Sequence, residues 1–412
     1  MKNSTGRRLL VTNGTIYAGG RRIDDGRMLI GADGRIEALG GAESGAPGSV
    51  AAGGVAAELE DAEALILDLG GGIVIPGLID QHVHGGGGWQ AMDATCEGLN
   101  GMSLYHAAHG TTSFLATTES AAKAEILAAL RNVARGAAGR GLEGAELLGV
   151  HLEGPFLNPI RCGAQDKENI RPADPDELHR YLEAAGGLIR IVTLAPEIEG
   201  GMEAAERLSR AGVAVSVGHS DATLAQVREA IRRGATQTTH HFNGMSPFHH
   251  REPGVAGAGL ICPALTTELI ADGIHVHPDA VKLLYDVKGA RGVCVITDAV
   301  SCAGLPDGEY GNAIMKDGQV WLKDGSSLAG SSLTMLQALR NVLRFTGRPL
   351  EEVLPSLTEV PARQIGASGR KGKLEAGMDA DFLVLDGALE LQATYVRGRQ
   401  VYAKTAADSP IE

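Results

Sequence analysis

The sequence is poor in aromatic residues, which make up 4% of its 412 residues, and it contains no apolar run long enough to cross a membrane. The first twenty residues also lack the apolar segment of a signal peptide. Glycine, by contrast, is abundant at 58 residues, a mix that favours a tightly packed α/β protein over a β-sandwich. We therefore expect a soluble protein of the cytoplasm.

Cysteine and positive charge are scarce as well. The five cysteines are widely spaced and include no C-x-x-C pair: Cys96, Cys162, Cys262, Cys294 and Cys302. This pattern argues against a disulfide framework and fits a reducing compartment. The 37 Lys and Arg against 50 Asp and Glu leave a net charge of -13, which disfavours nucleic acid or an anionic membrane as the main partner. An anionic substrate would need a local group of positive charges.

Short strand patterns are present at both ends of the chain. Residues 8–40 alternate apolar and polar positions around Asn-Gly and Asp-Gly turns, and residues 372–403 look similar. We therefore predict one small β-sandwich domain formed from both termini, residues 1–70 and 359–412. A stretch rich in Gly, Ala and Ser, residues 40–54, is predicted to be a flexible insertion.

The middle of the chain, residues 71–358, alternates strand-like and helical segments. Eight apolar strand-like runs occur there, at residues 73–84, 111–118, 146–155, 189–196, 214–219, 236–243, 266–273 and 292–300. Helical patterns separate most of them, including residues 121–137, 174–186, 223–234 and 278–289. This order implies parallel strands, and eight such units over roughly 250 residues predict a (β/α)8 TIM-type barrel. An open doubly wound sheet is the alternative, but no G-x-G-x-x-G turn follows the first strand.

Residues that can bind metal or transfer protons lie at the carboxyl ends of six of these predicted strands. They are His82, His84, Glu153, His219, His240, His275 and Asp298. Since all strand ends of a barrel meet at one mouth, we expect these residues to form one site. Each also has a structural explanation: His82 and His84 could be a polar strand end before a glycine loop, and Asp298 could belong to a turn.

Imidazole and carboxylate groups suit Zn²⁺ or a similar divalent ion, and three protein ligands leave a coordination position open for water. A neighbouring carboxylate can take the proton of that water and pass it to a leaving group. The residues therefore predict metal-assisted hydrolysis of an amide or a similar bond.

The strand-end H-x-H, the later histidines and the final aspartate resemble the amidohydrolase superfamily, whose members join a barrel to a small β domain. More narrowly, the chain resembles the N-acetylglucosamine-6-phosphate deacetylase family over nearly its whole length. Seven segments carry this resemblance: "GVHLEGPFLNP", "TLAPE", "VGHSDAT", "THHFNGMSPFHHREPGVAG", "IADGIHVHP", "ITDAVSCAG" and "LAGSSLTM". It implies an enzyme that removes acetate from N-acetylglucosamine 6-phosphate and commonly forms homodimers.

The resemblance also implies roles for the strand-end residues. The ligands of one divalent ion, Zn²⁺ by preference with Fe, Mn or Co as alternatives, would be Glu153, His219 and His240. Asp298 would act as general base toward water and then as acid toward the departing amine. Some members of the family lack the pair His82 and His84 and work with one ion, so this pair allows a second ion bridged by Glu153. One or two ions per subunit remain open at this point.

A second set of positions is implied to bind the phosphorylated amino sugar: Ala164, Gln165, Asn243, Gly244, Arg251, His275, Leu328, Ala329 and Gly330. Among them, Arg251 and His275 match phosphate-binding positions and would supply local positive charge. Gln165 stands where some members have a histidine that holds the acetyl carbonyl. A glutamine donates a neutral hydrogen bond there and no charge.

Two alternatives stay open. The first is another amidohydrolase that acts on an N-acyl amino acid, another N-acyl sugar or a cyclic amide, although no clear lysine stands at a mid-barrel strand end. The second, from a different class, is a catalytically silent barrel that serves as an assembly partner, which would fit a chain that had lost its ligands. We predict structural roles for His106 and His109, which lie three apart on a predicted helix.

Overall fold

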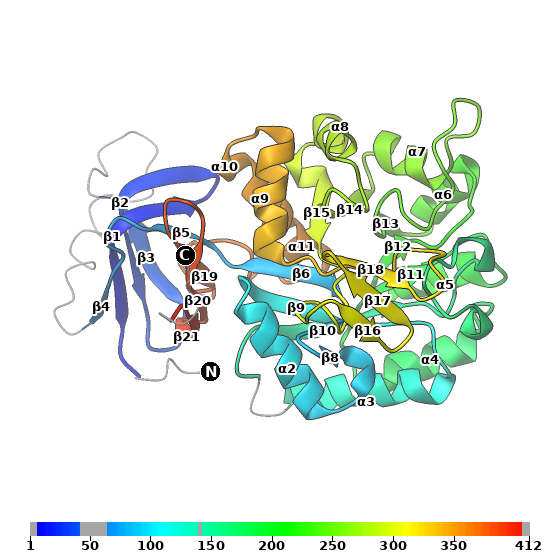
Figure 1. The fold of residues 1–412 in the computed structure, drawn as a ribbon, viewed down its shortest axis with the longest axis horizontal. Helices are drawn as coiled ribbons and strands as arrows, with labels where there is room; N and C mark the ends of the chain where they lie inside the picture. Colours follow the sequence, from blue (N-terminus) through cyan, green and yellow to red (C-terminus); the bar gives the residue numbers. More distant parts are fainter. Residues whose placement is uncertain (1–5, 42–63, 139–141, 406–412) are drawn as a thin grey trace.

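The structure is a computed structural model that describes residues 6–41, 64–138 and 142–405. A barrel of strands surrounded by helices lies beside a smaller β domain in which strands from both ends of the chain share one sheet (Figure 1). The predicted insertion at residues 40–54 falls outside the described residues except for Gly40 and Gly41. None of the helices in the described part of the chain combines the length and apolar character needed to cross a bilayer.

The barrel consists of eight parallel strands that follow one another in chain order. They are β6 (Leu78–Val83), β9 (Thr111–Thr118), β10 (Glu146–Glu153), β11 (Ile189–Leu194), β12 (Ala214–Val217), β13 (Ala235–Thr238), β14 (Thr266–Ile270) and β15 (Val293–Ile296). The first and last strands meet where the backbone N–H of Asp298 donates to the carbonyl of His82 at 2.9 Å. The hydroxyl of Thr297 donates to Asp80 Oδ2 across the same seam, at 2.5 Å. The predicted TIM-type barrel is confirmed.

Helices cover the outside of the barrel. They are α2 (Cys96–Ala107), α3 (Lys123–Ala138), α4 (Pro175–Ala184), α5 (Gly201–Arg210), α6 (Leu224–Arg232), α7 (Gly254–Ile261), α8 (Pro278–Lys288), α9 (Met335–Thr346), α10 (Leu350–Val353) and α11 (Glu359–Gln364). Several begin at capping residues that were visible in the sequence. The Asp174 side chain accepts from the N–H of Glu177, and Thr223 forms a capping box with Gln226.

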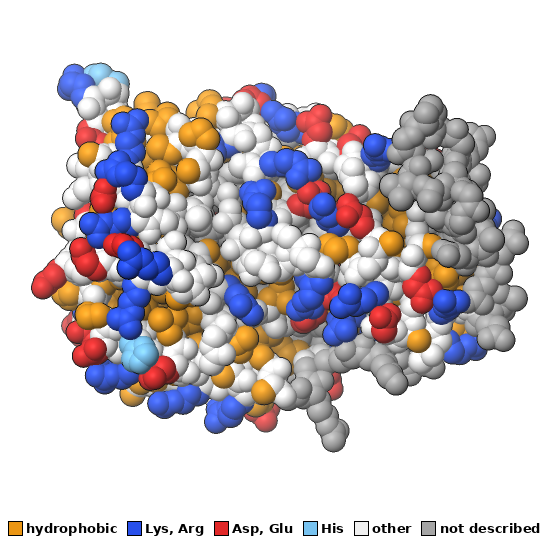
Figure 2. Space-filling model, turned by 180° about the vertical axis from the view of Figure 1, so that it is seen from behind, with side chains coloured by type: hydrophobic (Ala, Val, Ile, Leu, Met, Phe, Trp, Pro, Cys, Tyr) orange, Lys and Arg blue, Asp and Glu red, His pale blue; other side chains and the backbone are white. Residues whose placement is uncertain are grey.

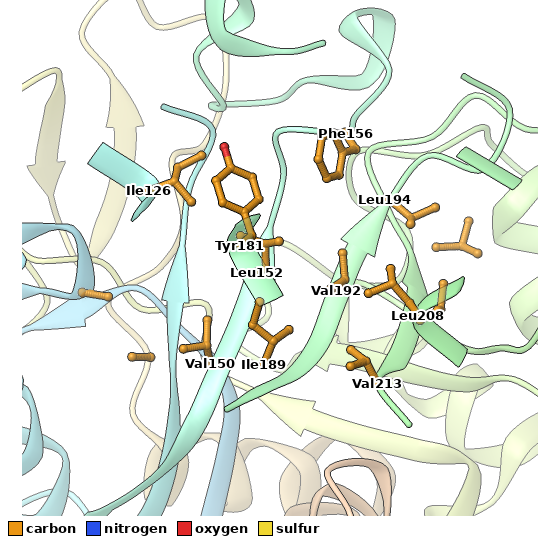
Figure 3. Close-up of a cluster of buried hydrophobic side chains, with 14 of the residues drawn as sticks. Ile126, Val150, Leu152, Phe156, Tyr181, Ile189, Val192, Leu194, Leu208 and Val213 are labelled. Atoms are coloured by element: carbon orange, nitrogen blue, oxygen red, sulfur yellow. The ribbon is translucent and has the colours of Figure 1, made fainter. Parts of the chain in front are cut away.

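The core between strands and helices explains which side chains reach the barrel interior. Figure 3 shows Val150 and Leu152 of β10 among apolar side chains of β11, α4 and α5. Fully burying one such side chain contributes about 1.5–3 kcal/mol. Because successive side chains of a strand point to opposite faces, His151 and Glu153, which alternate with Val150 and Leu152, face inward. The hydrophobic outer face of β10 therefore fixes the direction of Glu153.

The small domain is one mixed sheet that takes strands from both termini. Its strands are β1 (Leu9–Ala18), β2 (Arg21–Ile30), β3 (Ile36–Gly40), β4 (Leu65–Asp68), β5 (Ile73–Pro76), β19 (Phe382–Leu385), β20 (Leu391–Val396) and β21 (Arg399–Ala403). The order is β21-β20-β19-β5-β1-β2-β3, with β4 paired to β1. Met28 and Tyr395, from opposite ends of this order, belong to one buried cluster, so the sheet encloses its own core. The predicted domain built from both termini is confirmed.

The run at residues 73–84, predicted as one strand, is two strands in the structure, and that prediction was wrong. β5 pairs with β1 and β19 of the small domain, whereas β6 pairs with β9 of the barrel. The break falls at Gly77, where a Cβ would lie 2.2 Å from Thr112 Oγ1. Helix α11, after the predicted boundary at residue 358, contributes Ala362 to a cluster with the barrel residues Ile79 and Leu115. We propose domain boundaries at Gly77 and after α11.

A buried group of charges lies where the small domain meets the barrel. Lys371 Nζ is 2.6 Å from Glu146 Oε2 of β10 and 2.6 Å from Asp381 Oδ2, next to β19. Arg370 contacts Glu146 at 2.6 Å as well. Lys371 is fully buried whereas Glu146 and Arg370 are partly exposed, so removal of Glu146 would leave the buried ammonium group less well compensated and lower the stability. We infer that this group holds the two parts of the molecule together.

We expect Glu146→Gln to lower the melting temperature at neutral pH and to have less effect in acid. Burial alone would raise the pKa of Glu146, but the charges of Lys371 and Arg370 lower that pKa to about 2. The ionised form therefore contributes stability above its ordinary pKa of 4.5, and that contribution is lost as the pH falls toward 2. Thermal unfolding of both proteins from pH 7 downward measures this. A constant difference across the series would contradict the assignment.

Charged side chains cover much of the outer surface. Figure 2 shows a row of Lys and Arg down one edge of the barrel side, with Asp and Glu beside them. Helix α6 carries pairs of this kind, since Glu229 lies 2.5 Å from Arg232 and 2.8 Å from Arg233. Exposed pairs of this kind contribute little to stability because solvent and salt screen the two charges. The positive charges of this face are thus partly neutralised by acidic neighbours.

Candidate metal centre and active site

Four imidazoles surround one carboxylate at the mouth of the barrel. Glu153 Oε1 lies 3.4, 3.3 and 3.2 Å from the Nε2 atoms of His82, His219 and His240, and Oε2 lies 3.1 Å from His84 Nε2. Glu153 is 1% exposed. The structure therefore brings together the five residues proposed from the sequence as metal ligands.

Asp298 lies at the edge of the same group, as the second residue after β15. Its Oδ1 is 3.4 Å from His82 Nε2 and 3.3 Å from His84 Nε2. Burial alone would raise the pKa of Asp298, but the charge of His82 and contacts with His84 lower that pKa to about 2. Asp298 is thus held as a carboxylate beside the ligands, in the form that can accept a proton.

Three of the four imidazoles are held through their Nδ1 atoms. His219 Nδ1 is 2.9 Å from the carbonyl of Arg161, His240 Nδ1 is 3.1 Å from the carbonyl of Asn243, and His82 Nδ1 is 3.0 Å from Glu268 Oε2. These oxygens accept hydrogen bonds, so each Nδ1 carries a proton, and in the neutral ring the lone pair on Nε2 is available to a metal ion. Metal-ligating histidines are oriented in this way.

The distances between these nitrogen atoms indicate whether a metal ion fits among the histidines. The Nε2 atoms of His219 and His240 are only 3.0 Å apart, so two lone pairs face each other unless a cation or proton lies between them. Two groups share Glu153, namely His82–His84–Glu153 and Glu153–His219–His240, and the possible ligand atoms inside each group all lie within 4.8 Å of one another. A third such group consists of His82, His151 and Glu268. The residues present thus fit one or two divalent ions.

Charge in the centre also favours a cation. Burial would raise the pKa of Glu153, but the positive charge of His82 and the close contacts with His219 and His240 hold that pKa well below its usual value. Burial alone would lower the pKa of His84. The hydrogen bonds and charges of Asp298 and Glu153 outweigh the effect of burial and raise that pKa to about 9. The carboxylates therefore attract positive charge to the position between the histidines.

The backbone at the strand ends turns the ligands into the mouth. His219, His240 and Asp298 have φ angles of 47°, 28° and 53°, a left-handed conformation that side-chain-bearing residues rarely adopt. Each follows a strand directly or within two residues. Such strain is found where a structure holds a functional side chain in place.

A cavity of about 600 Å³ opens onto this centre. Of the residues predicted to bind substrate, eight line it: Ala164, Gln165, Asn243, Gly244, His275, Leu328, Ala329 and Gly330. Gln165 has its amide engaged already, since Nε2 donates to Glu153 Oε2 at 2.8 Å and Oε1 accepts from the N–H of Ser120 at 2.7 Å. His275 is held by Asp272 through Nδ1 at 2.6 Å.

Arg251 is the one predicted substrate residue outside the cavity lining. It is exposed, and its Nη1 lies 2.9 Å from His250 Nε2. The structure of this chain therefore does not place the guanidinium beside His275. Its proposed contact with phosphate stays a prediction.

One wall of the cavity was not foreseen. A three-stranded sheet inserted between β15 and α9, made of β16 (Gly308–Tyr310), β17 (Ala313–Lys316) and β18 (Gln319–Leu322), contributes Tyr310 and Leu322 to the lining (Figure 1). Asn312 and Glu119 line the cavity as well. The sequence did carry a signal for the sheet, because a Gly-Asn turn and an Asp-Gly turn separate short alternating runs there.

An eight-stranded barrel with a histidine and carboxylate centre at its mouth defines the class of metal-dependent amidohydrolases. The family model described as "Amidohydrolase family" matches residues 73–408, and the chain belongs to this family. A Bacillus subtilis relative named N-acetylglucosamine-6-phosphate deacetylase is 42% identical over 82% of this chain and 86% of its own length.

Two further proteins resemble this chain over most of its length. An N-acetylgalactosamine-6-phosphate deacetylase of Escherichia coli is 38% identical over 84% of this chain and 92% of its own. A solved structure of a Mycobacterium smegmatis N-acetyl-D-glucosamine-6-phosphate deacetylase variant, in complex with N-acetyl-D-glucosamine-6-phosphate, has a TM-score of 0.85. It is 33% identical and covers 96% of this chain and 99% of its own.

Proposed function

We propose that the protein removes the acetyl group of N-acetylglucosamine 6-phosphate by metal-dependent hydrolysis, giving glucosamine 6-phosphate and acetate. The observation that carries the proposal is the convergence of four imidazoles on Glu153 with Asp298 beside them, in a chain of the amidohydrolase family. Relatives that share more than a third of their residues with it bear deacetylase names, which supports the substrate class.

The residues suggest a division of labour. Glu153 and the histidines would hold a divalent ion, which would supply Lewis-acid chemistry toward the amide carbonyl and toward water. Asp298 Oδ1 accepts the proton of the attacking water and then donates it to the amide nitrogen as the C–N bond breaks. The walls of the cavity, including Leu328 and Ala329, keep bulk water away from the sugar.

We propose Zn²⁺ as the native metal, with Fe, Mn or Co as alternatives, and two ions per subunit. Imidazole nitrogens together with carboxylate oxygens are a donor set that these ions share, and Glu153 belongs to two groups of possible ligands, which supports a second ion. Metal analysis of protein purified without chelators tests both points. A ratio of one ion per chain would contradict the second ion at His82 and His84.

We extend the proposal to a homodimer that works in the cytoplasm. All five cysteines are free in the structure, which supports a reducing compartment. Light scattering of the purified protein tests the dimer.

Acetate release should be at least about tenfold faster, as kcat/KM, for N-acetylglucosamine 6-phosphate than for the sugar without phosphate, because a charged hydrogen bond is worth about 1.5–3 kcal/mol. His275→Ala should remove much of that preference and leave the slow reaction of the unphosphorylated sugar unchanged. N-acetylgalactosamine 6-phosphate and a panel of cyclic amides complete the comparison. Equal rates for phosphorylated and unphosphorylated sugars would defeat the substrate assignment.

A further inference from the structure

A buried carboxylate lies beneath the proposed metal centre. Glu268, in the middle of β14, is 0% exposed. Within the described residues, its ion-pair partner is His82, and no Lys or Arg side chain reaches it. A buried carboxylate without a cationic partner is costly, so its presence in a barrel strand calls for an explanation.

The contacts of Glu268 join both groups of proposed ligands. Its Oε2 lies 3.0 Å from His82 Nδ1 and accepts the backbone N–H of His240 at 3.2 Å. Its Oε1 accepts from Gln81 Nε2 at 2.8 Å. The carboxylate is therefore fixed on both oxygens, and it holds the ring of His82 and the backbone of His240 at the same time.

The direction of the hydrogen bond decides what Glu268 does to His82. A carboxylate accepts from Nδ1–H, so the proton of neutral His82 stays on Nδ1 and the lone pair stays on Nε2, which faces Glu153 and Asp298. His84 differs, since its Nδ1 is buried and has no hydrogen-bond partner. Of the two histidines in the H-x-H pair, only His82 is thus held through its Nδ1 by an acidic residue among the described contacts.

We propose that Glu268 is a positioning residue that sets the tautomer and ring orientation of His82, and that it thereby makes the His82–His84–Glu153 group able to bind its ion. This inference rests on the proposed function, since it takes His82 as a metal ligand. The neighbouring His151 does not serve the same end. Its ring packs edge-on against His82 at 4.4 Å, but its Nε2 contacts Thr193 Oγ1 at 2.7 Å.

The variant that tests this is Glu268→Gln, which keeps the volume of the side chain and removes its charge. Loss of a partner of this kind lowers metal affinity by about 10- to 100-fold. We expect that loss for one of two ions, while the ion at Glu153, His219 and His240 binds as before. Glu268→Asp, which keeps the charge, should restore part of the affinity and serves if the Gln variant folds poorly.

A matched control is Gln237→Met. Gln237 is equally buried, on the neighbouring strand β13, and accepts from Gln81 Nε2 at 3.1 Å without contacting a proposed ligand. It should change stability without changing metal affinity.

The experiment titrates metal-free protein with Zn²⁺ by calorimetry, and with Co²⁺ while its visible absorption is recorded, for Glu268→Gln, His82→Ala and the double variant. If Glu268 acts through His82, the double variant matches His82→Ala. Two ions bound by Glu268→Gln with unchanged affinity and spectrum would overturn the inference. So would a further loss in the double variant, because that would show a general structural effect. If His82→Ala itself bound both ions normally, the proposed ligand role of His82 would fail, and the inference with it.

Discussion

Asp298→Asn is expected to lower kcat for deacetylation by about two to four orders of magnitude, the range of a lost general base. The amide keeps the size of the side chain, so it can still contact His82 and His84, whose Nε2 atoms lie 3.4 and 3.3 Å from Oδ1. It cannot accept and return a proton. The metal content should therefore stay at the wild-type level while turnover is lost.

Steady-state acetate release and metal analysis of the same preparation measure both parts of this prediction. Asp286→Asn, which removes an equal charge from the exposed part of α8, is the control and should leave both quantities unchanged. Near-normal turnover in Asp298→Asn would rule out its role as the base. Loss of metal would show instead that Asp298 is needed as a ligand.

Glu153→Gln should have an even broader effect, since Glu153 belongs to both groups of ligand atoms. The amide lacks the negative charge that offsets four imidazoles at 3.1–3.4 Å. We expect both ions to be lost and kcat/KM to fall by at least roughly a thousandfold, because the charge that stabilises the transition state goes with the metal.

Metal analysis together with activity over a range of added Zn²⁺ tests this result. Glu119→Gln removes an exposed carboxylate from the lining of the same cavity and should retain both ions, since no proposed ligand is among the described ion-pair partners of Glu119. If Glu153→Gln kept two ions with high affinity, Glu153 would not be the bridging ligand.

Most of the barrel was predictable because its information is local. Each βα unit can be recognised in the sequence from an apolar strand, a capping residue such as Thr223 and a helix. The number of such units, eight, predicts a closed barrel. The split of residues 73–84 was not predictable in this way. Both halves are apolar, and only pairing with β19, more than 300 residues later in the chain, separates β5 from β6.

The residues of the site also divide into those that local sequence predicts and those whose role depends on contacts distant in the chain. Residues at strand ends, such as the proposed ligand His219 and the proposed base Asp298, could be found because the barrel geometry carries every strand end to one mouth. Glu268 was missed, although a charged residue inside an apolar strand was a visible signal. Its partners Gln81 and His82 lie 187 and 186 residues away, so the contact that gives it a role depends on the closed barrel.

The contact between the first and last barrel strands links the completion of the site to the order in which the chain is synthesised. Asp298 closes the ring by donating its N–H to the carbonyl of His82, so the last strand meets the first at the future reaction centre. Domains tend to fold as units from the N-terminus during synthesis. A nascent chain that ends before β15 therefore carries all of the proposed ligands but lacks both the proposed base and the contact that closes the ring. Hydrolytic competence arrives only when β15 has emerged and closed the ring.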